Sequence, residues 1–348
     1  MHRIALALLL AASPALAAAP APPPADAVLL APVTVSGVQP GPGMWRVARD
    51  GHALYVLGTI RPLPRDFEWD AADVEAVIGR AQEVLLTPSV RLKSDRGRVR
   101  SLLLVPALLR ARRDPERRSL QELVPADAYA RWSVLKARHI GRDRGVEQRR
   151  PLIAAQALYE EAIEDTGLSQ RSVVGPVVRR AARRHQVPLT EVPVEIEIDN
   201  LKALVRRVTE TRFDDVACFT ATLDRVEHDL GNMVERANAW AIGDIGALRA
   251  LPEEAQQQAC IDAVVESTLA EEAGISDLPV RLRSAWLENA ERALASNTVS
   301  FATLPISTLL VEDGVLADLA ARGYFVTAPG EATDDLAEPE AEGAAGLE

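Results

Sequence analysis

Residues 54–64 have the sequence LYVLGTIRPLP, and this stretch decides the fold. An apolar run with β-branched and aromatic residues, closed by Gly58, predicts a short buried strand that ends in a turn. Arg61 follows just beyond the carboxyl end of that strand. Because ligands of α/β proteins bind outside the carboxyl ends of the strands, we expect Arg61 to lie where a ligand would bind.

The segments on either side of this stretch predict its neighbours. Residues 44–47 and 53–58 are two short strands joined by a turn at residues 49–51, which makes a β-hairpin. Residues 70–82 carry apolar side chains at helical spacing, and Asp70 can cap their start. Residues 83–87 predict a buried strand that Pro88 ends. A strand, a helix and a strand in this order are typical of a parallel sheet with a right-handed crossover.

The other predicted strands lie mostly near the C-terminal end, at residues 187–192, 299–304 and 324–328. Helical spacing dominates between residues 102 and 295, and it includes one long helix over residues 214–240. We therefore expect an α+β (mixed α/β) fold. Its central mixed sheet is built from strands at both ends of the chain and flanked by helices, and a helical insert forms the middle.

The two termini have compositions that do not predict a fold. Residues 1–19 combine Arg3, a short apolar run and Ala15-Leu16-Ala17, the pattern of a secretory signal peptide cleaved near Ala17–Ala19. An uncleaved N-terminal anchor is the alternative. We expect residues 20–42 to be a Pro/Ala-rich linker and residues 329–348 to be an acidic disordered tail. The mature protein would then be periplasmic or secreted, with no transmembrane segment.

The chain has two cysteines, Cys218 and Cys260, and both lie in helical patterns. An exported protein with two cysteines can form one intramolecular disulfide, which would join two helices. Two unpaired buried thiols are the alternative.

The charge is unevenly distributed along the chain. The net charge is −11, but residues 91–150 hold 17 Lys and Arg against seven Asp and Glu. Such a segment can bind an anionic small molecule or a surface polyanion, such as anionic lipid headgroups or an acidic polysaccharide, or it can be an ordinary set of solvated helix faces. Nucleic acid is not an expected partner, because the chain is predicted to be exported and offers few aromatic side chains for base stacking.

No common catalytic motif is present. The chain has no Gly-x-Ser-x-Gly, no His-Glu-x-x-His and no phosphate-binding glycine loop. Its histidines are isolated: His2, His52, His139, His185 and His228. His139 and His185 lie at predicted helix ends, where the helix dipole favours a cation, and His228 follows Asp224 at helical spacing.

Several stretches resemble the TraB/GumN family, which is related to the Tiki proteins and to the ChaN-like fold. The opening resembles it over residues 44–47, 54–60 and 63–64. The ending resembles it over residues 286–294, 301–304, 313–316 and 322–326, and the middle over residues 236–240 and 243–244. The resemblance covers roughly residues 43–328, which we expect to be one domain.

The resemblance implies a metal-dependent hydrolase, protease-like in the Tiki branch. Its site consists of a Gly-x-x-His after the first strand, a Glu at the end of the second strand and a second Gly-x-x-His near the C-terminus. Neutral imidazoles and a carboxylate can hold a divalent cation and leave a position open for water. The cation then lowers the pKa of that water.

This sequence departs from the family pattern at each of those positions. Gly58 is kept, but Arg61 stands at the histidine position, and arginine stays protonated and offers only donors. Thr87 stands where the carboxylate would be. Ser307 and Thr308 lie in the segment that replaces the second Gly-x-x-His.

A fourth position is half kept, because Arg283 is followed by Ser284 where the family pattern has Arg-Asn. We therefore expect a degenerate member with no catalytic residues, no bound metal and no cofactor. Zinc, manganese or cobalt would be expected only if the ligands had been relocated.

Three functional hypotheses follow. The first is an exported binding or structural module in which Arg61, Thr87, Arg283, Ser307 and Thr308 form a pocket for a carboxylate or phosphate. In a purely structural alternative, Arg61 pairs with a nearby carboxylate. The second is a hydrolase that still works, with relocated metal ligands or without metal. The third is a polyanion or cell-surface binder that uses residues 91–150. Several His, Asp or Glu side chains converging near Gly58 or Thr87 would favour the hydrolase.

Overall fold

The computed structural model describes residues 37–94, 105–198, 200–251, 259–263, 267, 270–271 and 274–331. The expected signal peptide, most of the expected linker and almost all of the expected acidic tail lie outside the described residues. The last part of the expected linker contacts the folded body. There, Gln39 forms a β-bridge with Trp69, and the amide of Gly41 donates to the carbonyl of Ala241 at 2.9 Å. No helix in the described ranges has the length and hydropathy needed to cross a bilayer.

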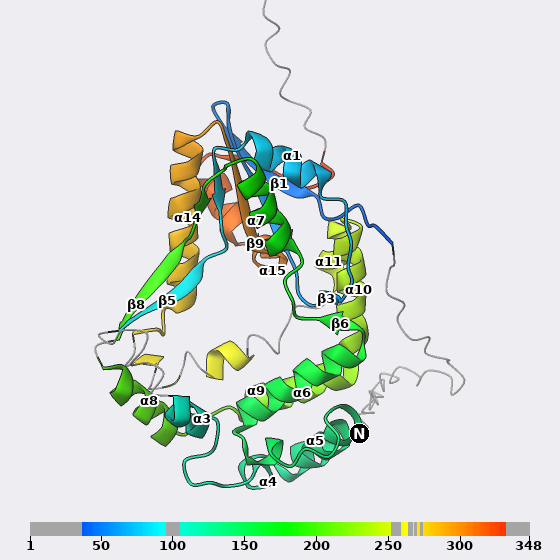
Figure 1. Ribbon diagram of the computed structural model, residues 1–348, viewed down its shortest axis with the longest axis vertical. Helices are drawn as coiled ribbons and strands as arrows, with labels where there is room; N and C mark the ends of the chain where they lie inside the picture. The colour runs from blue at the N-terminus through cyan, green and yellow to red at the C-terminus, as the bar shows by residue number, and fades with distance from the viewer. Residues whose placement is uncertain are drawn as a thin grey trace, which may run out of the picture. The chain divides into compact units, whose positions relative to one another are not determined.

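The main sheet has six strands in the order β10-β1-β2-β9-β4-β7. Figure 1 labels β1 and β9 of this sheet. The strands are β1 (Met44–Arg49), β2 (His52–Thr59), β4 (Glu83–Leu85), β7 (Leu189–Thr190), β9 (Val299–Pro305) and β10 (Phe325–Thr327). Strand β1 is antiparallel to β2 and β10, whereas β2, β9, β4 and β7 are parallel. Strands from both ends of the chain therefore build one mixed sheet, which confirms the predicted fold class.

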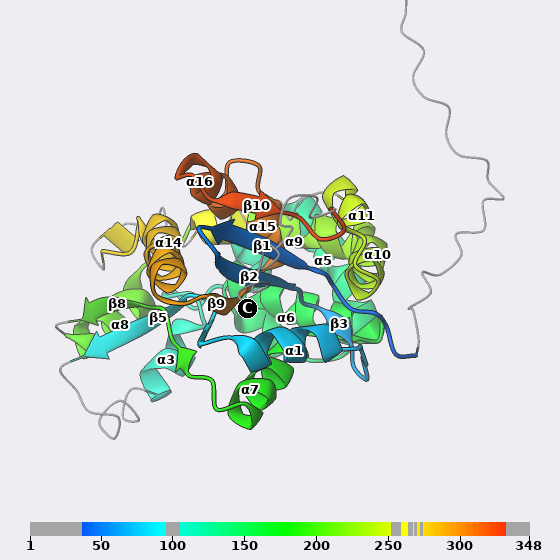
Figure 2. The ribbon, with the colours of Figure 1, turned by 90° about the horizontal axis from the view of Figure 1, so that it is seen from above.

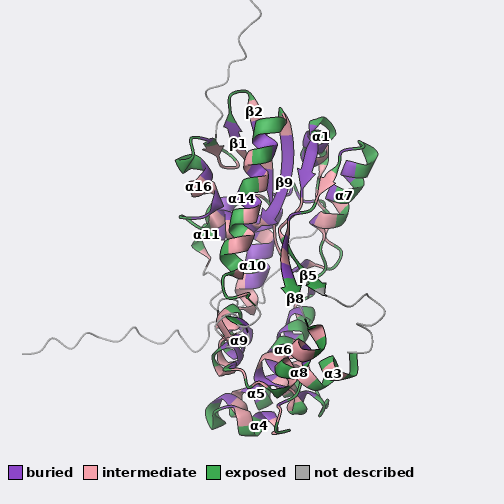
Figure 3. Cartoon of the chain, turned by 90° about the vertical axis from the view of Figure 1, so that its left-hand side faces the viewer, coloured by how far each residue is buried: buried purple, intermediate pink, exposed green. Residues whose placement is uncertain are grey.

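The hairpin that opens the sheet follows from local backbone chemistry. Asp50 and Gly51 both have positive φ angles, 51° and 80°, which fit the two-residue turn that joins tightly twisted antiparallel strands. The strand that follows is β2, and Leu54, Val56 and Leu57 in it are buried. Strand β2 pairs with β9, whose interior residues are all buried (Figure 3). This continuous apolar pattern is expected for parallel strands covered on both faces.

Helices cover both faces of the sheet (Figure 2). On one side lie α1 (Ala72–Arg80) and α7 (Val174–Arg184), which contact each other. On the other side lies α14 (Leu278–Ser296), which contacts β2, β4 and β9. The short helix α15 (Ile306–Leu310) begins directly after β9, and α16 (Val315–Ala321) contacts both α14 and α15.

The expected helical middle is also present. Its helices are α3 (Val105–Ala111), α4 (Leu120–Leu123), α5 (Ala126–His139), α6 (Pro151–Asp165), α8 (Leu201–Glu210), α9 (Val216–His228), α10 (Leu230–Ala241), α11 (Ile245–Ala250) and the short 3₁₀ helix η2 (Val146–Gln148). Two small sheets accompany it. In one, β3 (Leu63–Pro64) pairs with β6 (Leu168–Ser169), and in the other, β5 (Ser89–Ser94) pairs with β8 (Pro193–Ile198).

The elements differ from the prediction at two places. The helix predicted over residues 214–240 is two helices, because the chain breaks at Asp229, which ends α9 and begins α10 with φ −109° and ψ 0°. Strands β5 and β8 were not predicted, although Val194 and Ile196 alternate with Glu195 and Glu197 as a half-buried strand requires. The predicted strand, helix and strand are present as β2, α1 and β4, whose strands run parallel in one sheet with β9 between them.

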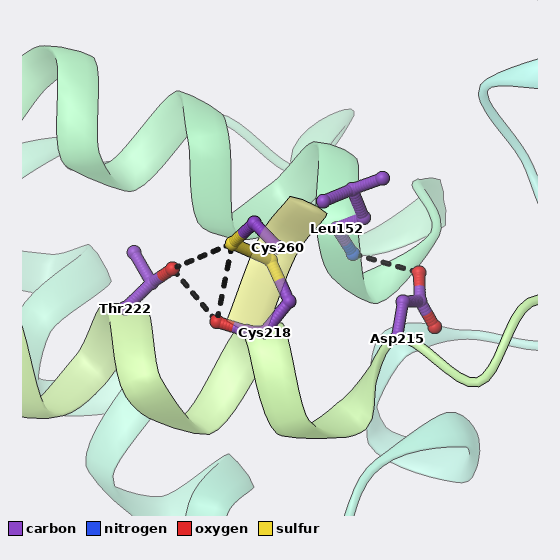
Figure 4. The surroundings of a disulfide bond; sticks show 5 residues. All are labelled: Leu152, Asp215, Cys218, Thr222 and Cys260. Atoms are coloured by element: carbon purple, nitrogen blue, oxygen red, sulfur yellow. Dashed lines mark hydrogen bonds between the residues drawn. A yellow bond between two sulfur atoms is a disulfide. The ribbon is translucent and has the colours of Figure 1, made fainter. Parts of the chain in front are cut away.

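Cys218 and Cys260 form a disulfide (Figure 4), so the alternative of two unpaired thiols is wrong. The bond joins α9 to the helical residues 259–263 and closes a loop of 42 residues. Beside it, the hydroxyl of Thr222 donates to the carbonyl of Cys218 at 2.8 Å. The buried Asp215 accepts a hydrogen bond from the amide of Leu152 at 2.8 Å, which ties the start of α9 to α6.

Candidate functional site

The parallel strands β2, β9 and β4 end at one edge of the main sheet. Thr59 at the end of β2 pairs with Pro305 at the end of β9, and Leu85 at the end of β4 pairs with Ala302. Parallel strands end on the same side of their sheet. The residues that follow the three strands therefore meet at this edge, and they include Arg61, Thr87 and the first turn of α15.

A basic pocket of 430 Å³ opens at this edge. Its wall is made by the end of β2, the segment after β4, the start of β5 and the first turns of α7, and its charged residues are Arg61, Arg91, Arg179 and Glu191. Hydroxyl groups of Thr59, Thr87, Ser89, Ser172 and Thr303 also line it. We call this cavity the basic pocket.

The charges of the basic pocket are only partly paired. Arg91 binds Glu191 through an Nη2–Oε2 contact of 2.5 Å. Arg61 and Arg179 are exposed, and neither makes a side-chain hydrogen bond or ion pair with any residue that the structure describes. The purely structural interpretation of Arg61, in which a carboxylate neutralises it, therefore finds no partner in the described chain. Of the three arginines in the pocket wall, Arg61 and Arg179 therefore have no carboxylate partner in the part of the chain that the structure describes.

The first turns of α7 place Arg179 in this pocket. The hydroxyl of Ser172 accepts a hydrogen bond from the amide of Gly175 at 3.2 Å, which fixes the start of the helix. Pro176 fits here because the first turn of a helix has amides without intrahelical partners. Arg179 lies four residues after Gly175, on the same helix face, and both line the pocket. The sequence predicted this helix, but the tertiary position of its first turn was missed.

Thr87 is held at the rim between two cavities. Its hydroxyl donates to the carbonyl of Thr303 at 3.0 Å and lies 3.2 Å from the hydroxyl of Thr303. Thr87 lines the basic pocket and also a second cavity of 290 Å³. We call the second cavity the apolar pocket. Most of its wall is formed by Pro279, Leu282, Trp286, Leu304, Val311 and Val315.

Arg283 also lines the apolar pocket, but its guanidinium group is engaged elsewhere. It donates to a carboxylate oxygen of Asp318 at 2.7 Å and to the carbonyl of Asp313 at 2.6 Å. The hydrogen bond to Asp318 raises the pKa of Arg283, and the same bond lowers the pKa of Asp318. Arg283 therefore fastens α14 to α16.

The remaining predicted positions are divided between structural and solvent-facing roles. Gly58 lies in neither pocket wall, and its carbonyl accepts a hydrogen bond from the indole of Trp240 at 2.8 Å. Thr308 lines the apolar pocket. Ser307 is exposed and lines neither pocket. The predicted site residues thus occupy two adjoining cavities rather than one mouth.

The donors at this edge do not fit the divalent metal that the family resemblance implies. Arginine offers no lone pair, and the hydroxyls of Thr87, Ser307 and Thr308 replace the imidazole and carboxylate ligands typical of such sites. Glu191 is the only carboxylate in the wall of the basic pocket, and Arg91 neutralises it. Across the described residues, no three His, Cys, Asp or Glu side chains are grouped so that they could hold a metal ion.

The described histidines lie in other surroundings. Nδ1 of His52 is 2.7 Å from the carbonyl of Asn297, at the opposite end of β2 from Arg61. Nδ1 of His139 is 2.7 Å from a carboxylate oxygen of Asp165, at the end of α5. His228 is close to Glu227, whereas the carboxylate of Asp224 binds Arg131 on another helix. The expected pairing of His228 with Asp224 is therefore replaced by a contact between helices.

Comparison with known proteins identifies the family. The model of the TraB/PrgY/gumN family matches residues 43–328, so the chain belongs to that family. Neither the curated proteins nor the solved structures contained a match.

Proposed function

We propose that this member of the TraB/PrgY/gumN family is an anion-binding module that does not use the metal chemistry of a hydrolase. The ligand is a small carboxylate or phosphate, and the basic pocket holds it. One observation carries the proposal: Arg61 and Arg179 line the same pocket and have no partner among the described residues.

Simple electrostatics supports an anion as the ligand. The pocket wall has three arginines and one glutamate, and the one glutamate is already paired with Arg91. A guanidinium group presents several donors in a plane, which match the oxygens of a carboxylate or phosphate. The positive end of the α7 dipole faces the same cavity, because the first turn of that helix lines it.

The proposal is tested by calorimetric titration of the full-length protein with phosphate and with acetate. We expect saturable binding in wild type, and binding at least tenfold weaker in Arg61→Ala and in Arg179→Ala. Each variant removes a charge-assisted hydrogen bond, which contributes about 1.5–3 kcal/mol. Arg180→Ala is the matched control, because Arg180 is an exposed neighbour on α7 that does not line the pocket. Equal affinities in all four proteins would refute the proposal.

A working metallohydrolase would retain a bound metal ion, whereas the proposed anion-binding module would not. We expect the purified protein, dialysed first against zinc, manganese or cobalt and then against metal-free buffer, to retain far less than one equivalent. Arginine beside a cation site repels the ion, and the described residues supply no set of three ligands. Stoichiometric retention of one metal, measured by atomic emission, would overturn this part of the proposal.

The alternative of a polyanion binder is less well supported by the described part of residues 91–150. Some of its basic side chains are occupied: Arg118 pairs with Asp114, Arg131 with Glu227, and Lys136 with Glu147. Arg150 is buried. Exposed arginines such as Arg112, Arg138 and Arg144 have no carboxylate partner among the described residues, so this alternative rests on those side chains.

We also propose that the protein functions outside the cytoplasm, in the periplasm or as a secreted protein. The disulfide supports this location, because disulfides persist in oxidising compartments. Fractionation of the producing cells, followed by N-terminal sequencing of the exported protein, tests the proposal. Export with a new N-terminus near residue 20 is expected, and an uncleaved cytoplasmic protein would contradict it.

A further inference from the structure

The apolar pocket adjoins the basic pocket. Thr87 belongs to both walls. At the end of β9, Thr303 lines the basic pocket and the next residue, Leu304, lines the apolar pocket. Successive side chains of a strand point to opposite faces of its sheet. The two cavities therefore lie on opposite faces of the sheet end and meet at Thr87.

The wall of the apolar pocket favours hydrocarbon over polar groups. Trp286, Leu304 and Val315 are almost fully buried and give it an apolar floor. Its polar members are largely satisfied within the protein, since Arg283 binds Asp318 and the Thr87 hydroxyl donates to Thr303. A charged group would gain little here, whereas an apolar group would be removed from water.

We propose that the natural ligand is an amphiphilic carboxylate with a medium-length alkyl chain. This inference rests on the proposed function, because it places the carboxylate in the basic pocket beside Arg61 and Arg179. The alkyl chain then passes Thr87 and enters the apolar pocket. The arginines of the basic pocket favour a carboxylate head group, and the apolar wall of the neighbouring pocket favours an alkyl tail.

The size of the apolar pocket sets the expected chain length. An apolar cavity of about 150 Å³ accommodates benzene, which has six carbons. The apolar pocket has 290 Å³. It therefore suits a chain of roughly ten to twelve carbons. Each methylene buried should tighten binding by about fourfold, until the pocket is full.

The experiment is a calorimetric titration of the full-length protein with acetate, butanoate, hexanoate, octanoate, decanoate, dodecanoate and tetradecanoate, each below its critical micelle concentration. We expect affinity to rise by about fifteenfold for each buried pair of added carbons and to level off once the pocket is full. Octanol, which has the same chain without the charge, should bind at least tenfold more weakly than octanoate.

Two variants fill the apolar pocket from different segments of the chain, α14 and the loop after α15. Leu282→Trp fills it from α14, and Val311→Trp fills it from a position that is 44% exposed, so this variant places less demand on the core. Each should abolish the dependence on chain length and leave acetate binding unchanged. Val280→Trp is the control, because Val280 is on α14, 65% exposed and outside the pocket wall.

The outcomes separate the inference from the proposed function. If wild type binds every carboxylate equally through Arg61, the ligand is a simple anion and the amphiphile inference fails while the proposed function stands. If no anion binds, both fail. If octanoate binds but ignores Arg61→Ala and both filling variants, it adsorbs elsewhere, and the inference is again overturned.

Discussion

At the scale of single residues, Gly58 shows how the opening motif supports the fold. A Cβ atom at this position would lie 2.3 Å from Cδ1 of Ile306 and 3.2 Å from the ring of Trp45, and both neighbours are buried. The glycine is therefore needed because α15 and Trp45 approach the strand closely.

We predict that Gly58→Ala lowers the free energy of unfolding by about 1–3 kcal/mol, because inserting a methyl group into a packed core forces side chains and backbone to shift. Chemical denaturation followed by circular dichroism measures the effect. Gly246→Ala on α11 is the control, because the nearest atom to a Cβ at Gly246 would be a carboxylate oxygen of Asp244, at 3.4 Å. Gly141 would not serve as a control, because its positive φ angle disfavours alanine. A Gly58→Ala protein as stable as wild type would show that the packing has room.

Glu83 is a second residue whose role is structural. It starts β4, at the opposite end of the sheet from the pockets, and accepts hydrogen bonds from Arg292, Thr190 and Asn297. Burial of Glu83 raises the pKa of its carboxyl group. The bonds from Arg292, Thr190 and Asn297 outweigh that effect, so the pKa lies below its usual value of 4.5.

A lowered pKa in the folded state means that the ionised carboxylate stabilises the protein above the unfolded pKa, and that this contribution is lost as pH falls through the folded pKa. We predict that Glu83→Gln costs about 2 kcal/mol at pH 7 and that the difference from wild type shrinks below pH 4.5. Denaturation at a series of pH values measures it. A difference independent of pH would contradict the assigned network.

At the scale of secondary-structure elements, Arg150 connects α6 to the end of α8. It precedes α6, is buried, and donates to the carbonyls of Val208, Thr209 and Thr211 at 2.6–3.2 Å. Carbonyls at a helix C-terminus lack intrahelical partners. Arg150 therefore completes the hydrogen bonding of the last turn of α8.

We predict that Arg150→Met lowers the free energy of unfolding by about 3 kcal/mol, because several carbonyls that it joins lose their charged donor together. Arg149→Met is the matched control, since the one side-chain ion pair of Arg149 within the described residues is with Asp143, at 4.0 Å. It should cost less than about 0.5 kcal/mol. Similar losses in the two variants would show that the last turn of α8 does not depend on Arg150.

Arg150 also shows where prediction from sequence stops. It lies in the basic segment whose arginines were expected to be mostly solvated, yet it is buried against carbonyls about sixty residues away. Strands such as β2 and β9 could be predicted, because a buried apolar run bounded by glycine or proline is a local signal. The carbonyl partners of a buried arginine are set only by tertiary packing.

The break at Asp229 illustrates the same limit for elements. Apolar side chains keep helical spacing across α9 and α10, so the sequence predicts one helix. Aspartate has only modest helix propensity, and tertiary packing determines where the chain turns.

At the scale of the whole molecule, the sheet brings the two ends of the sequence together. Strand β9, near the C-terminal end, lies between β2 and β4 from the N-terminal part. This arrangement carries the candidate site, because it places Thr303 and Leu304 between Arg61 and Thr87 at one edge. The sequence predicted that strands from both ends share a sheet and that Arg61 follows a strand end. It did not predict strand order, and therefore missed Arg179 and the division into two pockets.

We propose that Arg61 and Arg179 together bind one anion at this edge of the sheet. The most direct measurement is anomalous diffraction from crystals of the full-length protein grown with selenate, an analogue of sulfate and phosphate. We predict a selenium peak placed so that oxygens of the selenate lie within hydrogen-bonding distance of both guanidinium groups, and this peak should disappear in Arg61→Ala crystals. A basic pocket without selenium at saturating selenate, or a peak that persists unchanged in Arg61→Ala, would contradict it.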